Sequence, residues 1–161
     1  MKWAIVVVSD SIYYGRGIDE SGTIAEERLV KLGHVVAEKI ILPNDYKLLM
    51  KALIDLSRAV DAIIVIGGTG PSPRDLSIDV VEKISWRKMP GFGEIFRYLT
   101  YQTEGAKAIF TRAELYLVGL CPVAVIPGSP KAVKLGLDLL IEAIPHIVEE
   151  AKRIEGVHKS L

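Results

Sequence analysis

A glycine-rich stretch, Gly67-Gly68-Thr69-Gly70, directly follows an apolar run that is typical of a buried strand, Ala62–Ile66. Glycines in such a place let backbone N–H groups approach an anionic group without a Cβ in the way, and this suits a phosphate. A tight strand-to-helix turn uses the same residues, so spacing alone favours neither interpretation. Asp75, five residues after Gly70, favours a ligand site, because a carboxylate beside a phosphate cradle can hold a bridging Mg²⁺.

Two common phosphate-binding motifs are absent from this stretch. It lacks the Lys-Ser/Thr pair of a Walker A loop, and its glycines do not have the spacing of a dinucleotide fingerprint. The sequence therefore supports neither a P-loop NTPase nor a simple NAD-dependent enzyme.

Acidic and amide side chains in two other predicted loops are further candidates. Asp10 and Asp19 follow the first apolar run, and Asn44 and Asp45 follow the second. Each alone is more typical of a turn or a helix cap than of a ligand, because short polar side chains hydrogen-bond the local backbone. Together they could form an acidic site.

The stretch Pro127-Gly128-Ser129-Pro130 gives a rigid entry into a long helical segment, with Ser129 as the expected N-cap. The free N–H groups of such a helix start can bind an anion or the edge of a nucleobase. The simpler interpretation is a good helix start, and the residues alone leave both open.

Short apolar runs alternate with segments of helical periodicity. The predicted strands are Trp3–Val8, His34–Leu42, Ala62–Ile66, Leu115–Gly119 and Pro122–Ile126. The predicted helices are about Thr23–Leu32, a segment from Asn44 or Asp45 through Leu56, a short one capped by Ser77 that ends at Ile84, about Phe92–Tyr101, and a long one from Pro130. This alternation predicts an α/β fold with a mainly parallel sheet covered on both faces. Such sheets bind ligands at the carboxyl ends of their strands, so the loops after the first, third and last strands should share one rim.

Composition limits the classes of protein. A length of 161 residues without a linker, repeat or charge block predicts a single domain over residues 1–161. Lys plus Arg number 20, as do Asp plus Glu, and this balance argues against a nucleic-acid partner. The apolar runs are far shorter than the ~20 residues of a membrane span, and no signal-peptide pattern follows Lys2, so we expect a cytoplasmic protein.

Two residue counts add to this description. The lone Cys121 lies in an apolar stretch and is expected to be an inert core thiol rather than a nucleophile. The chain contains one Asn and one Gln, a depletion reported for thermophile proteins.

Three longer motifs follow one another along the chain. They are Gly67–Gly70 with Pro73-Arg74-Asp75, then Met89-Pro90-Gly91-Phe92-Gly93-Glu94, then Pro127-Gly128-Ser129-Pro130-Lys131. In this order they resemble the MoaB/Mog family of molybdenum cofactor biosynthesis proteins, and Ser9-Asp10 and Asp19-Glu20-Ser21-Gly22 are similar to the first loop of that family. The resemblance covers nearly the whole chain.

The resemblance implies a three-layer α/β/α sandwich, a homotrimer or hexamer, and transfer of AMP from MgATP to molybdopterin with release of pyrophosphate. Matching positions imply that Asp75 holds Mg²⁺ and aligns the nucleotide, and that Asp19 helps with the metal ion. The residues implied to bind phosphates, nucleotide or pterin are Ser9, Asp10, Asp19, Gly67, Gly68, Thr69, Gly70, Arg74, Glu94, Pro127, Gly128, Ser129 and Pro130. Hand-over to the molybdenum-inserting enzyme is also expected.

One position departs from the family's pattern. Adenylyltransferases have an aspartate directly after the proline that ends the second strand, whereas this chain has Asn44 there and Asp45 one residue later. If that acid is needed as a metal or proton partner, either Asp45 shifts by one residue to serve as the second catalytic residue beside Asp75, or the activity is weakened. The leading hypothesis is thus a molybdopterin adenylyltransferase, and the alternative is a non-catalytic molybdopterin-binding or carrier protein of the same family.

Overall fold

Apolar side chains alternate along the first strand, β1 (Lys2–Val8), and divide the interior into two cores. Trp3, Ile5 and Val7 lie in one core, and Ala4, Val6 and Val8 lie in the other. Successive side chains of a strand point to opposite faces of a sheet, so both faces of β1 are buried. A sheet of this kind must be covered by helices on both sides.

The computed structural model describes residues 1–153. After β1 its elements are, in chain order, α1 (Asp10–Tyr13), α2 (Glu20–Lys31), β2 (Val35–Leu42), α3 (Tyr46–Ser57), β3 (Ala62–Ile66), α4 (Ser77–Ile84), β4 (Arg87–Lys88), α5 (Pro90–Glu104), the 3-10 helix η1 (Gly105–Phe110), β5 (Glu114–Val118), β6 (Cys121–Ile126) and α6 (Pro130–Lys152).

The strands form one sheet in the order β2-β1-β3-β6-β5-β4. β1 pairs in parallel with β2 and β3, and β3 pairs in parallel with β6. β5 is antiparallel to both of its neighbours, β4 and β6. Only Gly119 and Leu120 separate it from β6, and so short a connection can join only antiparallel strands. The predicted mainly parallel α/β sheet is confirmed.

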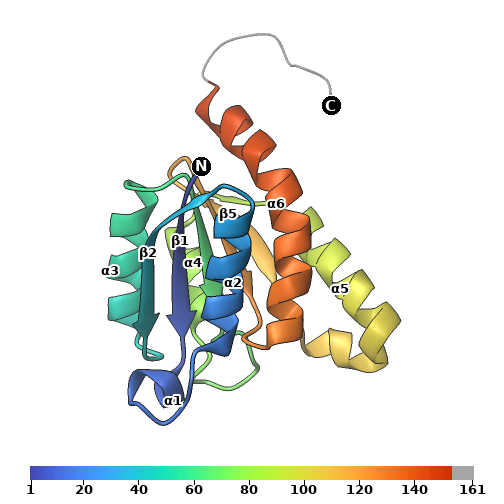
Figure 1. Ribbon diagram of the computed structural model, residues 1–161. Helices are drawn as coiled ribbons and strands as arrows, with labels where there is room; N and C mark the ends of the chain where they lie inside the picture. The colour runs from blue at the N-terminus through green and yellow to red at the C-terminus, as the bar shows by residue number, and fades with distance from the viewer. Residues whose placement is uncertain (154–161) are drawn as a thin grey trace.

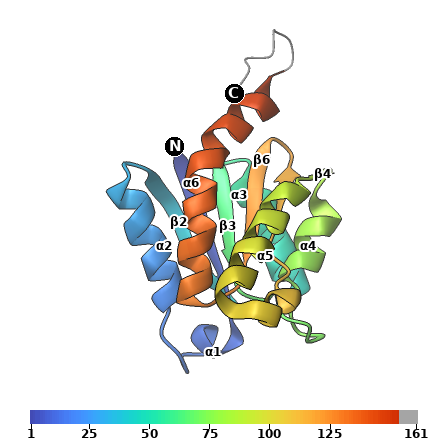
Figure 2. The same ribbon diagram turned by 90° about the vertical axis from the view of Figure 1, so that its right-hand side faces the viewer.

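Helices cover the two faces of the sheet in separate layers (Figures 1 and 2). α2 and α6 pack on the core that contains Trp3, with α5 beside them, and α3 and α4 pack on the other core. No helix within residues 1–153 is long and apolar enough to cross a membrane.

The expected element boundaries need three corrections. α2 begins at Glu20 rather than near Thr23, because the carboxylate of Asp19 caps it by accepting the N–H of Gly22. α5 is longer than predicted at both ends. Ser77 is the first residue of α4 rather than its cap, because its buried hydroxyl donates to the carbonyl of Gly67. The short elements α1, η1 and β4 were not expected.

Cys121 is a buried member of the core on the α3 and α4 side of the sheet. Burial in apolar surroundings raises the pKa of its thiol to about 12, so the thiolate is not available at neutral pH. The expectation of an inert core thiol is confirmed.

Adjacent leucines of α3 provide a test of the packing on this face. Leu49 is fully buried, whereas the side chain of Leu48 is 46% exposed. Leu49→Ala should lower the free energy of unfolding by about 2–5 kcal/mol, because it leaves a cavity under the sheet. Leu48→Ala is the control and should change that free energy by less than about 0.5 kcal/mol in a denaturant titration. Equal losses in the two variants would contradict the observed orientation of α3.

Candidate functional site

The carboxyl ends of β1, β3 and β6 meet at one edge of the sheet, at the bottom of Figure 1. The loops that leave these ends carry the candidate residues, as the sequence predicts. Gly67 donates its N–H to the carbonyl of Ile126 at 2.9 Å, and Ser9 donates its N–H to the carbonyl of Leu42 at 2.9 Å. Backbone hydrogen bonds therefore join the loops after β3 and β1 to the ends of the neighbouring strands β6 and β2.

The glycine loop (67–70) requires glycine at its first two positions. Gly67 and Gly68 have φ values of +96° and +63°, which residues with a side chain rarely adopt. A Cβ on Gly67 would lie 2.5 Å from the carbonyl oxygen of Val8, and a Cβ on Gly68 would collide with the hydroxyl of Ser77. Ser77 fixes the loop by donating its hydroxyl to Gly67 at 2.7 Å and its N–H to the carbonyl of Gly68 at 3.0 Å.

The carboxylate of Asp75 lies directly against the glycine loop. A Cβ on Gly70 would be only 2.6 Å from Asp75 Oδ2, so the absence of a side chain at Gly70 makes room for this acid. The same Oδ2 accepts the N–H of Ser72 at 3.2 Å. Asp75 and Gly67–Gly70, whose spacing in the sequence suggests one ligand site, thus lie together in the structure.

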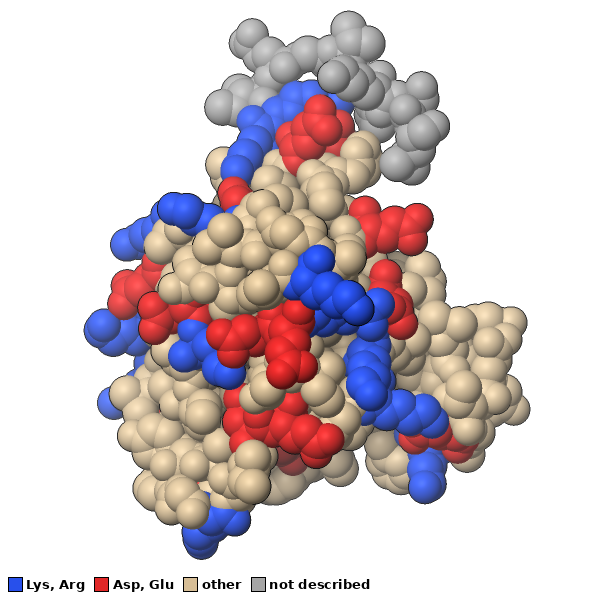
Figure 3. Space-filling view, viewed as in Figure 1, with Lys and Arg blue, Asp and Glu red and all other residues tan. Residues whose placement is uncertain are grey.

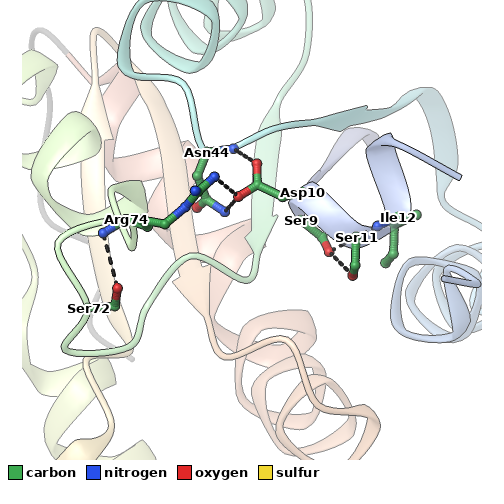
Figure 4. Close-up of polar contacts among 7 residues, drawn as sticks. All are labelled: Ser9, Asp10, Ser11, Ile12, Asn44, Ser72 and Arg74. Atoms are coloured by element: carbon green, nitrogen blue, oxygen red, sulfur yellow. Dashed lines mark hydrogen bonds and ion pairs between the residues drawn. The ribbon is translucent and has the colours of Figure 1, made fainter. Parts of the chain in front are cut away.

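Asp10 is the centre of a polar cluster that connects the first loop with the segment after Gly70 (Figure 4). Its Oδ1 accepts the N–H of Asn44 at 2.9 Å, and its Oδ2 accepts the Asn44 amide at 3.2 Å and the Arg74 guanidinium at 2.6 Å. The hydrogen bond from the Asn44 backbone is the largest cause that lowers the pKa of Asp10, and the Asn44 amide and Arg74 add to it against the opposing effect of burial. Asp10 therefore remains a carboxylate throughout the neutral range.

Asn44 and Asp45 have different roles in the structure. The Asn44 side chain points toward Asp10, and its own Oδ1 is buried without a partner in the described chain. The carboxylate of Asp45 caps α3 by accepting the N–H of Leu48 at 2.9 Å. The carboxylate is therefore engaged at the start of the helix, and the catalytic role expected for Asp45 stays a prediction.

The loop at Pro127–Pro130 lies against the first loop. Ser21 donates its hydroxyl to the carbonyl of Gly128 at 2.7 Å, and Ser129 caps α6 by accepting the N–H of Ala132 at 3.2 Å. A cavity of about 260 Å³ opens between the loops, and its lining includes Ser9, Asp19, Gly67, Gly128 and Pro130. The second carboxylate oxygen of Asp19 is buried and has no partner among the described residues.

A second cavity lies on the other side of the same loop. It has a volume of about 310 Å³ and is bounded by α5, Thr111 and the start of α6. Pro127 and Ser129 contribute to its wall, as do Lys131 and Glu104, which form an ion pair at 2.9 Å. The Pro127–Pro130 loop therefore separates two cavities.

Glu94 is the predicted site residue that the structure does not bring to this rim. It is exposed near the start of α5, the end of the helix that joins β5 through a hydrogen bond from the N–H of Met89 to the carbonyl of Leu115. The last turn of α5, at Glu104, is the end that reaches the rim. A binding role for Glu94 stays a prediction.

Arg112 is a residue of the site that sequence reasoning missed. Its guanidinium donates to the carbonyl oxygens of Thr69 at 3.0 Å, Gly70 at 2.7 Å and Asp75 at 3.0 Å. Arg112 lies in the stretch between the expected helix at 92–101 and the strand from Leu115, where the pattern predicts no element. No local signal links it with a loop about forty residues earlier.

The charges around the site do not by themselves define a metal centre. No group of three or more His, Cys, Asp or Glu side chains within residues 1–153 is arranged to hold a metal ion. Acidic and basic side chains are interspersed over the face shown in Figure 3. A divalent cation at the rim would have to share its ligands between the protein and a bound phosphate.

Comparison with protein families gives one match that covers most of the chain. Residues 4–146 match the family described as "Probable molybdopterin binding domain". Curated relatives include a molybdopterin adenylyltransferase of Pyrococcus furiosus, 30% identical, with 94% of this chain and 91% of the relative covered. A molybdenum cofactor biosynthesis protein B of Halalkalibacterium halodurans is 36% identical, with 93% and 89% covered.

Solved structures agree with this match. The tungsten cofactor synthesizing protein MoaB of Pyrococcus furiosus superposes with a TM-score of 0.87 at 32% identity, and the comparison covers 94% of this chain and 97% of that one. A structure described as MogA gives a TM-score of 0.85 at 27% identity, with 94% and 99% covered.

The Asp10 cluster predicts a specific titration behaviour. Arg74→Ala should raise the pKa of Asp10 only part of the way to its ordinary value of 3.8, because the larger effect, the hydrogen bond from the Asn44 backbone, remains. The pKa is measured by carboxyl ¹³C NMR. A lowered pKa stabilises the folded state above pH 3.8, and this contribution is lost as the pH falls through the folded-state pKa. A pKa at the ordinary value in Arg74→Ala would show that the ion pair controls the ionisation.

Proposed function

The chain belongs to the family of probable molybdopterin-binding domains, and from this premise we propose that it is a molybdopterin adenylyltransferase in molybdenum cofactor biosynthesis. The reaction would transfer AMP from MgATP to molybdopterin and release pyrophosphate. One observation carries this proposal: the carboxylate of Asp75 is held against Gly70, inside a loop whose glycines leave backbone N–H groups free for a phosphate.

The proposed reaction is a displacement at phosphorus. A terminal phosphate oxygen of molybdopterin forms a bond to the α-phosphorus of ATP, and the bond from this phosphorus to the oxygen bridging to the β-phosphorus breaks. Pyrophosphate leaves with that oxygen and with its negative charge. Such a transfer depends on positioning and on neutralising charge more than on covalent help from the protein. The rim of the sheet offers both a backbone cradle and carboxylates for a cation.

The carboxylates at the rim fit a Mg²⁺ that is shared with the phosphates. Mg²⁺ is commonly held by one or two carboxylates together with substrate phosphates, and it keeps several waters. Asp75 offers an oxygen at the glycine loop, and Asp19 has a buried carboxylate oxygen without a partner among residues 1–153. We assign the metal ion to these two acids, and its chemistry would be to neutralise the departing pyrophosphate.

The two cavities beside the Pro127–Pro130 loop suit a pair of substrates that each carry a ring system. Their volumes are about 260 and 310 Å³; Gly67 of the glycine loop lines the smaller one, and Pro127 and Ser129 line the larger one. Three further predicted binding residues, Ser9, Asp10 and Arg74, lie at the same rim. We therefore place the nucleotide and the pterin on the two sides of this loop, with their phosphates at the glycine loop.

A second candidate function is a non-catalytic molybdopterin carrier. Asn44 favours it, because this residue stands where the family's enzymes have an acid and its amide is used to hold Asp10. Asp45, the nearest acid, caps α3 with one carboxylate oxygen, and this cap competes with the role of the missing acid. A carrier would bind the pterin but would release no pyrophosphate.

We also propose that the protein acts as a homotrimer or hexamer in the cytoplasm and passes its product to a molybdenum-inserting enzyme. Exposed apolar side chains on α5 and η1 are consistent with a buried subunit contact. Ile109 is 80% exposed and Phe110 is 68% exposed in the single chain.

Asp75→Asn tests the proposed reaction. We expect the variant to keep its fold and to lose roughly 10²–10³-fold in turnover, because a preorganised charge at the reacting phosphate is removed. Turnover is measured as pyrophosphate and adenylylated pterin after anaerobic incubation with molybdopterin and MgATP.

Asp45→Asn is the matched variant, because Asn is also a good helix cap. We expect a smaller loss of turnover than in Asp75→Asn, and a loss of similar size would assign Asp45 a catalytic role. Saturable pterin binding by the wild-type protein without any product would favour the carrier instead. Wild-type turnover in Asp75→Asn would refute the assignment of Asp75.

A further inference from the structure

Arg112 makes an unusual set of contacts for an arginine. Arginine side chains typically pair with carboxylates or phosphates through a planar fork of five donors. Here the fork instead donates to three backbone carbonyls, those of Thr69, Gly70 and Asp75, at 3.0, 2.7 and 3.0 Å. Its one ion-pair partner in the described chain, Asp79, is 3.6 Å away and more than half exposed. The carbonyl contacts are therefore the principal role of the guanidinium.

The carbonyls that Arg112 binds determine where the neighbouring N–H groups point. In a planar trans peptide the carbonyl and the N–H of the next residue point in opposite directions. Holding the carbonyls of Thr69 and Asp75 toward Arg112 therefore turns the N–H groups of Gly70 and Leu76 away from it. The third carbonyl that Arg112 binds is that of Gly70. It is followed by Pro71, which has no N–H, so this contact anchors the loop without orienting a donor.

The donors that are oriented in this way have no acceptor of their own. Within residues 1–153, neither Gly70 nor Leu76 donates its N–H to a protein oxygen, and the N–H groups of Gly68 and Thr69 are unpaired as well. Unpaired N–H groups beside glycines form a concave site that attracts an anion. A cation beneath the loop increases this attraction further.

We propose that Arg112 is a positioning residue, which holds the glycine loop and Asp75 in the orientation that binds the phosphates of the substrate. This inference rests on the proposed function for the identity of the phosphates, but the anion site itself requires only the observed loop. Thr111, the residue before Arg112, lines the cavity of about 310 Å³. Arg112 therefore joins the wall of that cavity to the phosphate-binding loop.

Three variants test this role. Arg112→Ala removes the fork, and Arg112→Lys keeps the charge but replaces the fork by a single ammonium group. Asp79→Asn is the matched control, because it removes the ion-pair partner and leaves the carbonyl contacts in place. Circular dichroism and the melting temperature establish that each variant is folded.

Pyrophosphate is the first probe, because binding it does not require turnover. We expect its Kd to rise about tenfold to a hundredfold in Arg112→Ala, the loss expected when hydrogen bonds to a charged group are misaligned. The ¹H–¹⁵N signals of Gly70 and Leu76 should move on adding pyrophosphate to the wild-type protein, and these movements should vanish in Arg112→Ala. Methylguanidinium should restore them in this variant. Asp79→Asn should bind within about twofold of the wild type.

Kinetics separate positioning from a general loss of structure. In Arg112→Lys we expect the KM for MgATP to rise more than kcat falls, because the loop retains its charge but not its fixed orientation. If Arg112→Ala is unfolded, the Gly70 and Leu76 signals are followed on adding pyrophosphate to Arg112→Lys instead. The proposal would be overturned if a folded Arg112 variant bound pyrophosphate with wild-type affinity and showed the wild-type movements of the Gly70 and Leu76 signals. An equal loss of pyrophosphate affinity in Asp79→Asn would also overturn it.

The outcomes also separate this inference from the proposed function. Pyrophosphate binding that depends on Arg112, in a protein that yields no adenylylated pterin, would support the positioning role and refute the adenylyltransferase. Failure of the wild-type protein to bind either pyrophosphate or MgATP would overturn the positioning role.

Discussion

Close approach of backbone to backbone at the carboxyl edge of the sheet is the constraint on which the rest of the site depends. The carbonyl of Val8 occupies the space where Gly67 would carry a Cβ, and a Cβ on Gly128 would touch Gly67 at 3.4 Å. The ends of β1, β3 and β6 are thus packed together without side chains between them. In this packing the N–H of Gly67 binds the carbonyl of Ile126, whereas the N–H groups of the partly exposed Gly68 and Gly70 have no acceptor in the described chain and are free for a phosphate. The extended apolar strands behind the rim supply the rigidity that such a loop cannot supply for itself.

Most of the fold could be predicted because its signals are local. Continuous β-branched runs identify the buried strands, and helical periodicity identifies α3 and α6, so the order of elements and the shared rim followed from the chain alone. β4 was missed because two residues carry no periodicity, and its strand character arises only from pairing with Tyr116 and Leu117. Ser77 was taken for a cap because Ser commonly caps helices, but a carbonyl ten residues earlier competes for its hydroxyl.

The site was predictable only where its residues are close together in the sequence. Asp75 and the glycines of residues 67–70 belong to one loop, so spacing alone could place them together. Arg112 approaches the same loop across 37 to 43 residues, and nothing in a single sequence marks such a contact. The contacts of Asn44 are likewise not visible in the sequence. The sequence identifies it as a departure from an acid, whereas only the structure shows that its amide and its backbone both bind Asp10.

The hydrogen bonds at the rim also divide the acids into two kinds. Asp10 accepts three hydrogen bonds, one of them from a guanidinium, so its charge is already balanced and its lone pairs are largely used. Asp75 accepts one hydrogen bond from Ser72, and one oxygen of Asp19 accepts none within the described chain. A cation binds most strongly to carboxylate oxygens that are not already saturated by donors. An acid at position 44 would place a second negative charge beside Asp10, whereas Asn44 stabilises Asp10 as an anion. This division of the acids is consistent with the proposed assignment of the metal ion to Asp75 and Asp19.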